Sequence, residues 1–320
     1  MIEIDGSIGE GGGQVTRTSL SLSALTGTPV RITNIRAGRD KPGLRPQHLM
    51  AVRAVRSIAR GTLEGAEESA CELTYTPGEI VGGKYEFNIG TAGSSILVAQ
   101  TVLPILLAAK KKSNVRIIGG THNPKAPTWD YFERVFLPAL RLFGCKVSAT
   151  LLRAGYYPKG GGEIELRVEP SKPAPVDIWP RESVPKGIIS LANLPLSIAM
   201  REKKIFIDNR IEDVRIREEK ALDQGNAVLL WRGFVGCAVL GKKGKRAEEV
   251  AKECVEGLEK EGDADVDRHL ADQLLVYAAL AGKTTFKTSL LSNHTTTSIR
   301  VIGEFLGKKF EAKGNEVKVG

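Results

Sequence analysis

The stretch SLLSNHTTTSIRVIGEFLG, Ser289 to Gly307, contains the change from strand to helix around which the chain is arranged. Apolar residues from Phe286 to Leu291 predict a strand that ends in a polar turn. After the turn, apolar residues recur at helical spacing and predict a helix from Ser298 to Leu306. His294 lies at the junction, and the four hydroxyl residues after it are all candidate N-cap residues.

A histidine at the start of a helix lies among free backbone N–H groups and the positive end of the helix dipole. Such a place disfavours the imidazolium form, so the ring of His294 should be neutral at pH 7. The same place suits an anion, because helix N-termini bind phosphate. His294 is therefore a candidate nucleophile for a phosphorus centre. The alternative is a turn histidine whose ring bonds a backbone carbonyl.

The order of elements around this stretch occurs three times at a period of roughly 70 to 80 residues. In each occurrence a strand, a small-residue turn and a helix are followed by a second strand, a polar loop, a second helix and a hairpin. VRITNIRAG (Val30 to Gly38) and VRIIGG (Val115 to Gly120) occupy equivalent places in the first two units. The pattern predicts an α/β fold of three β-α-β-α-β-β units, each a sheet with two helices on one face.

The third unit is interrupted. Its first strand is predicted at PVDIWP, Pro175 to Pro180, whereas its first helix begins only after Val266. The residues between have their own predicted strands and a terminal helix, enough for a small inserted α/β domain. We therefore expect a large domain of residues 1–183 and 263–320 and an inserted domain of residues 184–262.

The composition of the chain limits the class of protein and of partner only broadly. The chain has 320 residues, 46 Lys and Arg against 37 Asp and Glu, and a net charge of +9. That charge favours a polyanionic partner such as nucleic acid, although runs such as GKKGKR also fit a solvated surface. Four cysteines form no CxxC pair, and the longest apolar stretch, Ile96 to Ala109, is too short to span a bilayer. With no secretory leader, we expect a cytoplasmic protein without a membrane partner.

Two kinds of loop could form a site: the turn before the first helix of each unit and the loop before the second. GEGGGQ contains Glu10, which could bind Mg²⁺ or Mn²⁺ or could serve as a helix-dipole partner. The loop from Arg36 to His48 suits phosphate or RNA, or is a solvated turn. It has four cations, Arg36, Arg39, Lys41 and Arg45. In HLADQ, a capping or surface role is the alternative to a ligand-binding face formed by His269, Asp272 and Gln273.

These segments together resemble the RNA 3′-terminal phosphate cyclase family. The similarity runs along the whole chain through DGSIGEGGGQVTRTSLSLS, IRAGRDKPGLRPQH, GTAGSS, GGTHNPKAP, GYYPKGGGE, HLADQL and SNHTTTSI. It implies a fold like that of the C-terminal domain of a translation initiation factor and of enolpyruvyl transferases, with a small inserted domain. It also implies an ATP-dependent ligase that acts in RNA processing on RNA with a 3′-phosphate end.

The family's reaction has three steps. A histidine takes AMP from ATP, AMP passes to the RNA 3′-phosphate, and the vicinal 2′-hydroxyl expels AMP to give a 2′,3′-cyclic phosphate. By position, the resemblance assigns the nucleophile to His294, a metal-binding role with Mg²⁺ or Mn²⁺ to Glu10, and essential arginines to Arg17 and Arg39. It assigns substrate binding to Gln47 and Lys159, and nucleotide binding to Gln100, His269, Leu270, Ala271, Asp272 and Gln273.

Two departures and two rival functions accompany this resemblance. Lys159 stands where some members have arginine, and a lysine cannot bind phosphate in a bidentate manner. His269 stands where some members have an aromatic residue. One rival is a non-catalytic cyclase-like protein of ribosome biogenesis, which lacks the histidine nucleophile; the other is an enolpyruvyl transferase. His48 and His122 are expected to be structural or peripheral. The RNA, the preferred metal, the oligomeric state and the role of the inserted domain stay open.

Overall fold

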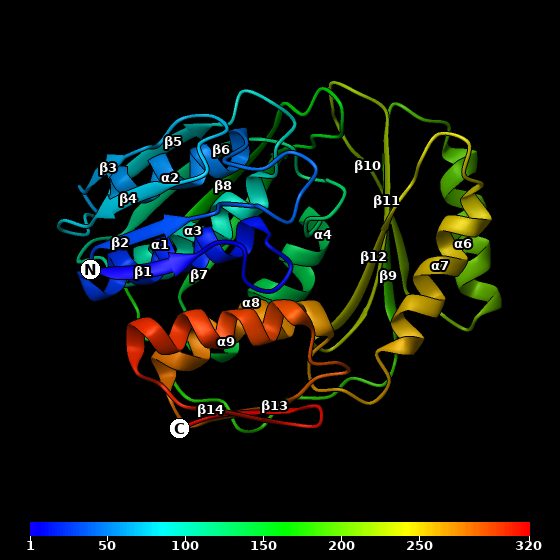
Figure 1. The fold of residues 1–320 in the computed structure, drawn as a ribbon. Coiled ribbons are helices and arrows are strands. Elements are labelled where there is room, and N and C mark those ends of the chain that lie inside the picture. The colour runs from blue at the N-terminus through cyan, green and yellow to red at the C-terminus, as the bar shows by residue number, and fades with distance from the viewer.

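Two sheets with the same strand order form most of the large domain in the computed structural model, which describes residues 1–320 (Figure 1). The first unit consists of β1 (Ile2–Asp5), α1 (Gly13–Thr26), β2 (Val30–Thr33), α2 (Pro46–Ile58), β3 (Thr62–Glu64) and β4 (Leu73–Thr76). The second consists of β5 (Lys84–Asn88), α3 (Ser95–Leu107), β6 (Ser113–Gly119), α4 (Trp129–Tyr131), the π-helical turn η1 (Phe132–Phe136), α5 (Leu137–Leu142), β7 (Val147–Arg153) and β8 (Gly162–Val168).

The strand pairing of these two units is the same. The sheets run β1-β2-β4-β3 and β5-β6-β8-β7; in each, the first two strands are parallel and the remaining pairs are antiparallel. A parallel pair needs a crossover, which α1 supplies in the first unit and α3 in the second. The predicted α/β fold of repeated units is confirmed by this topology.

The third unit departs from the prediction at its first strand. It contains α8 (Arg268–Ala281), β13 (Thr284–Lys287), α9 (Asn293–Leu306), β14 (Phe310–Lys313) and β15 (Glu316–Val319), and its sheet is β13-β15-β14. The strand predicted at Pro175 to Pro180 does not form. Val176 and Trp179 are buried against the β13 region. The N–H of Val176 donates to Oγ1 of Thr284, and its carbonyl oxygen accepts the N–H of Thr285. The indole of Trp179 donates to the carbonyl oxygen of Thr285. No ladder forms, because the prolines at both ends have no N–H to donate.

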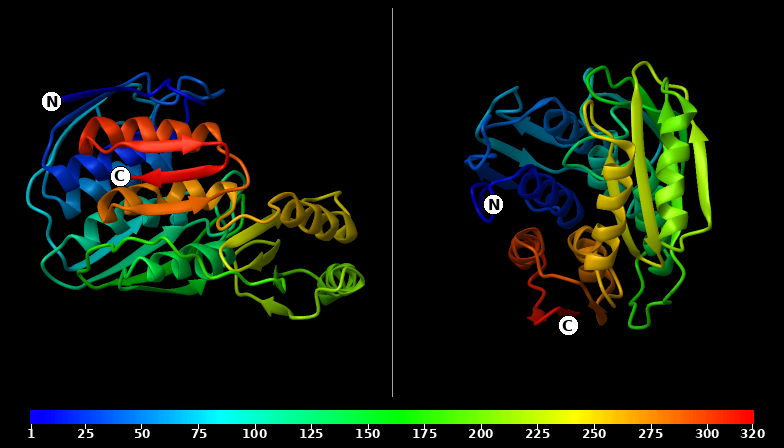
Figure 2. Two further views of the ribbon diagram at one scale, coloured as in Figure 1. Left: turned by 90° about the horizontal axis from the view of Figure 1, so that it is seen from below. Right: turned by 90° about the vertical axis from the view of Figure 1, so that its right-hand side faces the viewer.

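The inserted segment forms a sheet of its own. Its elements are β9 (Lys186–Ala192), α6 (Leu196–Asp208), β10 (Val214–Glu218), β11 (Gly225–Arg232), β12 (Val235–Leu240) and α7 (Ala247–Lys260), with the strand order β10-β9-β11-β12. Helices α6 and α7 pack side by side on one face of this sheet, and the segment projects from one end of the large domain (Figure 2). No helix combines the length and the apolar composition that a membrane crossing requires.

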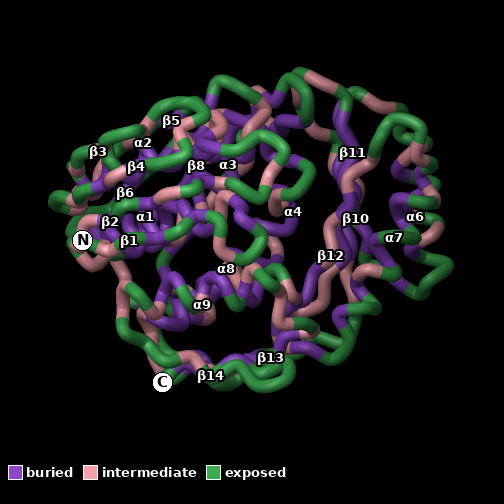
Figure 3. Tube along the Cα trace, in the orientation of Figure 1, coloured by how far each residue is buried: buried purple, intermediate pink, exposed green.

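The two largest hydrophobic clusters form the cores of these parts. A cluster of 59 buried residues draws on all three units and surrounds the meeting of α1, α3 and α8. A second cluster of 16 buried residues lies between Ile189 and Ala264. Figure 3 shows the buried residues along the inner helices and in the strands of the inserted sheet. Since α1 also packs on α9, the first and third units meet directly.

Helix α9 begins earlier than predicted. Ser292, not a residue after His294, is the N-cap, and its hydroxyl accepts the N–H of Thr295 at 3.2 Å. The prediction of a start at Ser298 is wrong because the threonines that suggested a turn are themselves in the first turn of the helix, with Thr295 and Thr297 buried against its neighbours. His294 therefore lies inside the first turn, and the helix ends at Gly307 with a φ of 59°.

Candidate active site

The ring of His294 faces the glycine-rich turn that precedes α1. Its Nε2 atom lies 3.2 Å from Oε2 of Glu10, and both side chains are more than one third exposed. The turn approaches α9 so closely that a Cβ on Gly9, whose φ is +64°, would lie 2.0 Å from Oγ1 of Thr297. A glycine is required there both for the left-handed backbone and for the close approach. Helix α9 and the turn thus form the two sides of one site.

Arg39 reaches the same carboxylate from the basic loop before α2. Its Nη2 atom lies 3.3 Å from Oε2 of Glu10, with 34% of the side chain exposed. The loop lies against the glycine-rich turn, because a Cβ on Gly38 would lie 2.7 Å from the carbonyl oxygen of Glu10. Glu10 is therefore shared between a histidine and an arginine, and all three side chains remain accessible to a ligand.

The other cations of this loop are largely used to hold it. Nη1 of Arg36 donates to the carbonyl oxygens of Lys41 and Gly43 at 2.6 and 2.8 Å. Arg45 forms an ion pair with Glu68 at 3.5 Å. Arg36 is thus a structural residue of the loop, and Arg39 is the arginine that this loop presents to Glu10.

The surroundings of His294 favour its neutral form. Partial burial lowers the pKa of the ring below its usual value near 6.5, and the nearby Glu10 carboxylate acts in the opposite direction. The positive charges of Arg39 and Arg17 lower the pKa further, and His269 adds to this effect. The ring also lies in the first turn of α9, where the helix dipole disfavours imidazolium. An unprotonated nitrogen is what a nucleophile needs.

Gln14 joins three helices at this site, a role that the sequence analysis did not assign. Its Nε2 atom is 2.8 Å from Oδ2 of Asp272, 2.7 Å from Oγ of Ser298 and 3.3 Å from the carbonyl oxygen of His294. The side chain starts from α1 and so connects α1 to α8 and α9. Its place in the motif GEGGGQ was the only available signal, since its partners are distant in the sequence.

Arg17 and Asp272, the partner of Gln14, lie close enough for their charges to interact. Burial raises the pKa of the Asp272 carboxyl to about 8, against the opposing charge of Arg17, while Asp267 and Glu10 add to the increase. Burial likewise lowers the pKa of the Arg17 guanidinium to about 10, and Asp272 partly offsets that effect. An anionic ligand beside Arg17 would meet a cation that has already lost part of its hydration.

A small polar pocket of about 70 Å³, open to solvent on one side, lies between α1, α3 and α8. Arg17, Gln100, Asp272 and Gln273 line it together with Gln14. Nε2 of Gln100 donates to Oε1 of Gln273 at 2.5 Å, which joins the second and third units across the pocket. Because Gln14 and Asp272 connect the pocket to α9, the predicted nucleotide-binding residues and His294 belong to adjoining parts of the molecule.

Four other predicted site residues do not line this pocket. Leu270 and Ala271 are completely buried in the core, so their side chains cannot reach a ligand. Oε1 of Gln47 accepts the N–H of Ser94 at 2.8 Å, at the start of α3. Lys159 is exposed, and its Nζ donates to the carbonyl oxygen of Leu222 in the inserted domain at 3.3 Å. Ligand binding by the side chains of Gln47 and Lys159, and by the backbone of Leu270 and Ala271, stays a prediction.

His48 is a buried structural residue beside the site. Its Nδ1 accepts the N–H of Arg45 at 3.3 Å, and a Cβ on Gly13 would lie 2.2 Å from its Nε2. Burial first, and then the charge of Arg17, lowers its pKa to about 3, so the ring is neutral. It fixes the start of α2 against the start of α1.

The protein is built of repeated α/β units, and the first and third units bring a histidine, a carboxylate and two arginines together. Residues 8–312 match the family described as RNA 3′-terminal phosphate cyclase. The chain belongs to this family, which confirms the resemblance stated from its sequence motifs.

Proteins named RNA 3′-terminal phosphate cyclase are similar to it over nearly their full length. That of Archaeoglobus fulgidus is 43% identical, with 99% of each chain covered. That of Pyrococcus furiosus is 41% identical, with 98% of this chain and 96% of the relative covered. The protein of Ectopseudomonas mendocina is 42% identical, with coverage of 95% and 92%.

Among solved structures, the chain is similar to enolpyruvyl transferases. NikO from Streptomyces tendae has a TM-score of 0.43 and 12% identity, with 100% of this chain and 48% of the other covered. EPSP synthase from Acinetobacter baumannii has a TM-score of 0.32 and 14% identity, with coverage of 99% and 63%. The chain thus spans about half of the first protein and less than two thirds of the second.

Proposed function

We propose that this protein uses ATP to convert an RNA 3′-phosphate end into a 2′,3′-cyclic phosphate, through AMP bound covalently to His294. The observation that carries this proposal is the ring of His294, neutral and accessible at the start of α9, with Nε2 3.2 Å from Glu10. Membership of the cyclase family and the names of the relatives supply the substrate class.

In the first step His294 attacks the α-phosphorus of ATP. For this step the ring proton has to be on Nδ1 and Nε2 has to leave its contact with the Glu10 carboxylate, so that its lone pair faces the phosphorus. A bond forms between Nε2 and the phosphorus, the bond to the bridging oxygen breaks, and pyrophosphate leaves. Arg39 and Arg17 are suited to neutralise the phosphate charge that develops, since one is exposed beside Glu10 and the other is desolvated near Asp272. The backbone N–H groups at the start of α9 favour the same anion.

In the second step an oxygen of the RNA 3′-phosphate bonds to that phosphorus, the P–N bond breaks, and an RNA(3′)pp(5′)A end forms. A proton on the departing imidazole makes it a better leaving group. In the third step the 2′-hydroxyl oxygen bonds to the 3′-phosphorus, AMP leaves, and the hydroxyl proton is lost. Adenylation is useful because it gives a poor phosphate electrophile a good leaving group.

Glu10 is the residue that would hold a divalent metal. Its carboxylate is 40% exposed and faces the site, and Mg²⁺ often takes one or two carboxylates together with substrate phosphates. When bound, Mg²⁺ or Mn²⁺ would offset phosphate charge. Glu10 also orients the His294 ring through their contact, and it holds Arg39 beside that ring.

The pocket between α1, α3 and α8 suits the nucleotide. Gln100, Asp272 and Gln273 offer donors and acceptors there, and Arg17 offers a cation. His269, one turn before Gln273 on α8, is close enough to affect the charge of His294. Gln47 and Lys159 lie toward the second unit and the inserted domain, where an RNA end would approach.

The test is a search for the covalent adduct. We would incubate the protein with Mg²⁺ or Mn²⁺ and ATP labelled in the α-phosphate, and would look for protein-bound label that resists alkali and is lost in acid. His294→Ala should abolish the adduct, whereas Asn293→Ala, on the exposed neighbouring position of the same helix, should keep it. An unchanged adduct in His294→Ala would falsify the assignment.

The same assay separates the rival functions. A non-catalytic cyclase-like protein would bind RNA but form no adduct with ATP, and an enolpyruvyl transferase would form none either. A 3′-phosphorylated RNA added to the labelled protein should release AMP and acquire an end that resists phosphatase. If the adduct forms and no cyclic end follows, the proposed acceptor is wrong.

A further inference from the structure

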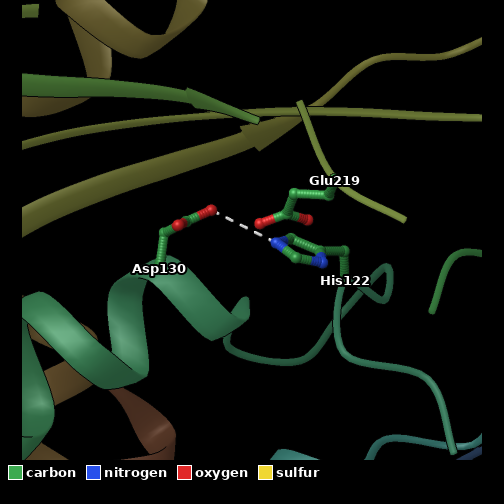
Figure 4. Close-up of side chains that lie close together, drawn as sticks. All are labelled: His122, Asp130 and Glu219. Carbon is green, nitrogen blue, oxygen red and sulfur yellow. Dashed lines mark hydrogen bonds and ion pairs between the residues drawn. The ribbon is translucent and has the colours of Figure 1, made fainter. Parts of the chain in front are cut away.

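A second cluster of ionisable side chains lies where the inserted domain meets the large domain. It consists of His122 in the loop after β6, Asp130 in α4, and Glu219 directly after β10 (Figure 4). One potential ligand atom from each residue lies within 4.8 Å of the other two. His122 and Asp130 are buried, with 0% and 1% of their side chains exposed. None of the three residues has a part in the proposed cyclase reaction.

The ring of His122 is held in one orientation. Its Nδ1 lies 2.8 Å from Oγ1 of Thr121, and that hydroxyl accepts the N–H of Gly155 at 2.9 Å and lies 3.5 Å from its carbonyl oxygen. Tyr156 stacks on the ring, with centroids 4.7 Å apart and planes 12° apart. If Thr121 donates to the Gly155 carbonyl, it accepts the proton of Nδ1. The lone pair of Nε2 then points at the carboxylates.

The two carboxylates are also oriented by neighbours. Ser190 donates to Oδ2 of Asp130 at 2.9 Å, and Arg217 donates to Oδ1 at 3.0 Å. The hydroxyl of Tyr156 lies 3.4 Å from Oε2 of Glu219. Such outer hydrogen bonds to histidine and carboxylate groups are the usual support of metal ligands.

The charges at this junction leave room for a cation. Arg217 pairs with Asp130 at 3.0 Å and with Glu133 at 2.8 Å, and Arg134 pairs with Glu133 at 3.1 Å. With Glu219 close by, three carboxylates meet two guanidinium groups. Nε2 of His122 is 3.2 Å from Oδ2 of Asp130. Two ligand atoms on one zinc ion, at bonds of about 2.0–2.2 Å, lie roughly 3.4 Å apart in tetrahedral geometry. The observed separation therefore fits a shared ion.

We propose that His122, Asp130 and Glu219 bind one divalent transition-metal ion of the Zn²⁺ type. An imidazole with two carboxylates selects such a metal over Mg²⁺ or Ca²⁺, which prefer oxygen ligands. Three protein ligands leave a fourth position for water. Because Glu219 belongs to the inserted domain and the other ligands to the large domain, the ion fastens one domain to the other.

The test uses metal alone, so it is independent of ATP and RNA. Chelator-treated protein would be titrated with Co²⁺, whose visible absorption reports its ligands, and bound Co²⁺ would then be displaced with Zn²⁺. The titration is done in Glu10→Gln, which removes the carboxylate of the candidate active site. We expect one tight site per chain, and a higher midpoint of thermal unfolding with Zn²⁺ than without it.

Glu219→Gln removes one ligand and keeps the size of the side chain. In the Glu10→Gln background it should weaken Co²⁺ binding at least about 100-fold, the upper end of what loss of a mere supporting hydrogen bond costs. Glu133→Gln is the matched control, because it removes another carboxylate from Arg217 without removing a ligand. If Glu219→Gln does not fold, His122→Gln takes its place as the variant that lacks one ligand. Equal Co²⁺ affinity with and without Glu219, or no tight site in Glu10→Gln, overturns the proposal.

Discussion

Oε2 of Glu10 lies 3.2 Å from Nε2 of His294, although the two residues stand at opposite ends of the chain. This contact exists because α1 packs on α9 and the glycine-rich turn before α1 passes over the start of α9. It joins the candidate metal ligand to the candidate nucleophile. The first and third repeats therefore both contribute to a site that neither could form alone.

Glu10→Gln tests the role of this carboxylate. The amide is the same size but carries no charge, so it should bind a divalent metal poorly and hold Arg39 less well. We expect slower adduct formation and a metal requirement shifted to higher concentrations, measured by titrating Mn²⁺ into the α-labelled ATP assay. Glu3→Gln, on exposed β1, is the control. A metal titration that matches the wild-type curve would show that Glu10 is not a ligand.

The pH dependence of His294 follows from its lowered pKa. The nucleophile is the neutral ring, whose fraction increases as pH rises through the pKa. Adduct formation should therefore rise with pH at a midpoint below 6.5 and level off above that midpoint. NMR titration of the ring protons checks the pKa without turnover. In Glu10→Gln the pKa should fall further, because the carboxylate that favours imidazolium is gone. A pKa above 6.5 in the wild-type protein contradicts this account.

Asp272 should make stability depend on pH between about 3.8 and 8. Its folded pKa is raised from 3.8 to about 8, so the folded state binds the proton more tightly than the unfolded chain. The resulting stability is complete below pH 3.8 and is lost as pH rises through about 8. Asp272→Asn removes this loss. Its thermal unfolding midpoint should therefore fall less than that of the wild type between pH 6 and pH 9.

The exposed Asp263 provides the control for that experiment. Its side chain is 79% exposed, so Asp263→Asn should leave the wild-type dependence in place. If Asp272→Asn and the wild type lose stability in parallel between pH 6 and pH 9, the carboxyl of Asp272 is charged throughout that range and the raised pKa is wrong.

Ser292→Ala tests the cap that positions His294. The hydroxyl accepts the N–H of Thr295, and loss of such a cap costs about 1 kcal/mol in the free energy of unfolding. Adduct formation should also slow, since the first turn of α9 frays. Ser292→Asp retains an acceptor and should recover most of both losses. Urea unfolding and the labelling assay measure the two effects. Equal stability of Ser292→Ala and the wild type would show that the cap contributes nothing.

Much of the local structure could be predicted because its signals are local. The alternation in VRIIGG and the helical spacing after His294 correspond to β6 and α9. The apolar residues of Pro175 to Pro180 predict a strand that does not form, because the prolines at both ends have no N–H to donate to a ladder. The start of α9 was misplaced because threonine suits both a turn and a buried helical position.

The candidate site was only partly accessible from the sequence. Sequence motifs named Glu10 and His294 separately, and their contact required the packing of α1 on α9. The sequence did not indicate that Gln14 connects three helices, because hydrogen bonds between residues far apart in the chain produce no periodic pattern. The junction of His122 with Glu219 was missed for the same reason, and His122 was expected to be peripheral.

The sequence alone determined the repeated order of strands and helices, the interruption of the third repeat and the resemblance to a family, since these depend on residue type and spacing along the chain. Tertiary structure decided which side chains meet: a carboxylate from the first unit with a histidine from the last, and ligand atoms from two domains at one junction. The physical reason is that side-chain periodicity reports the nearest turns, whereas a site depends on how buried faces of distant segments pack together.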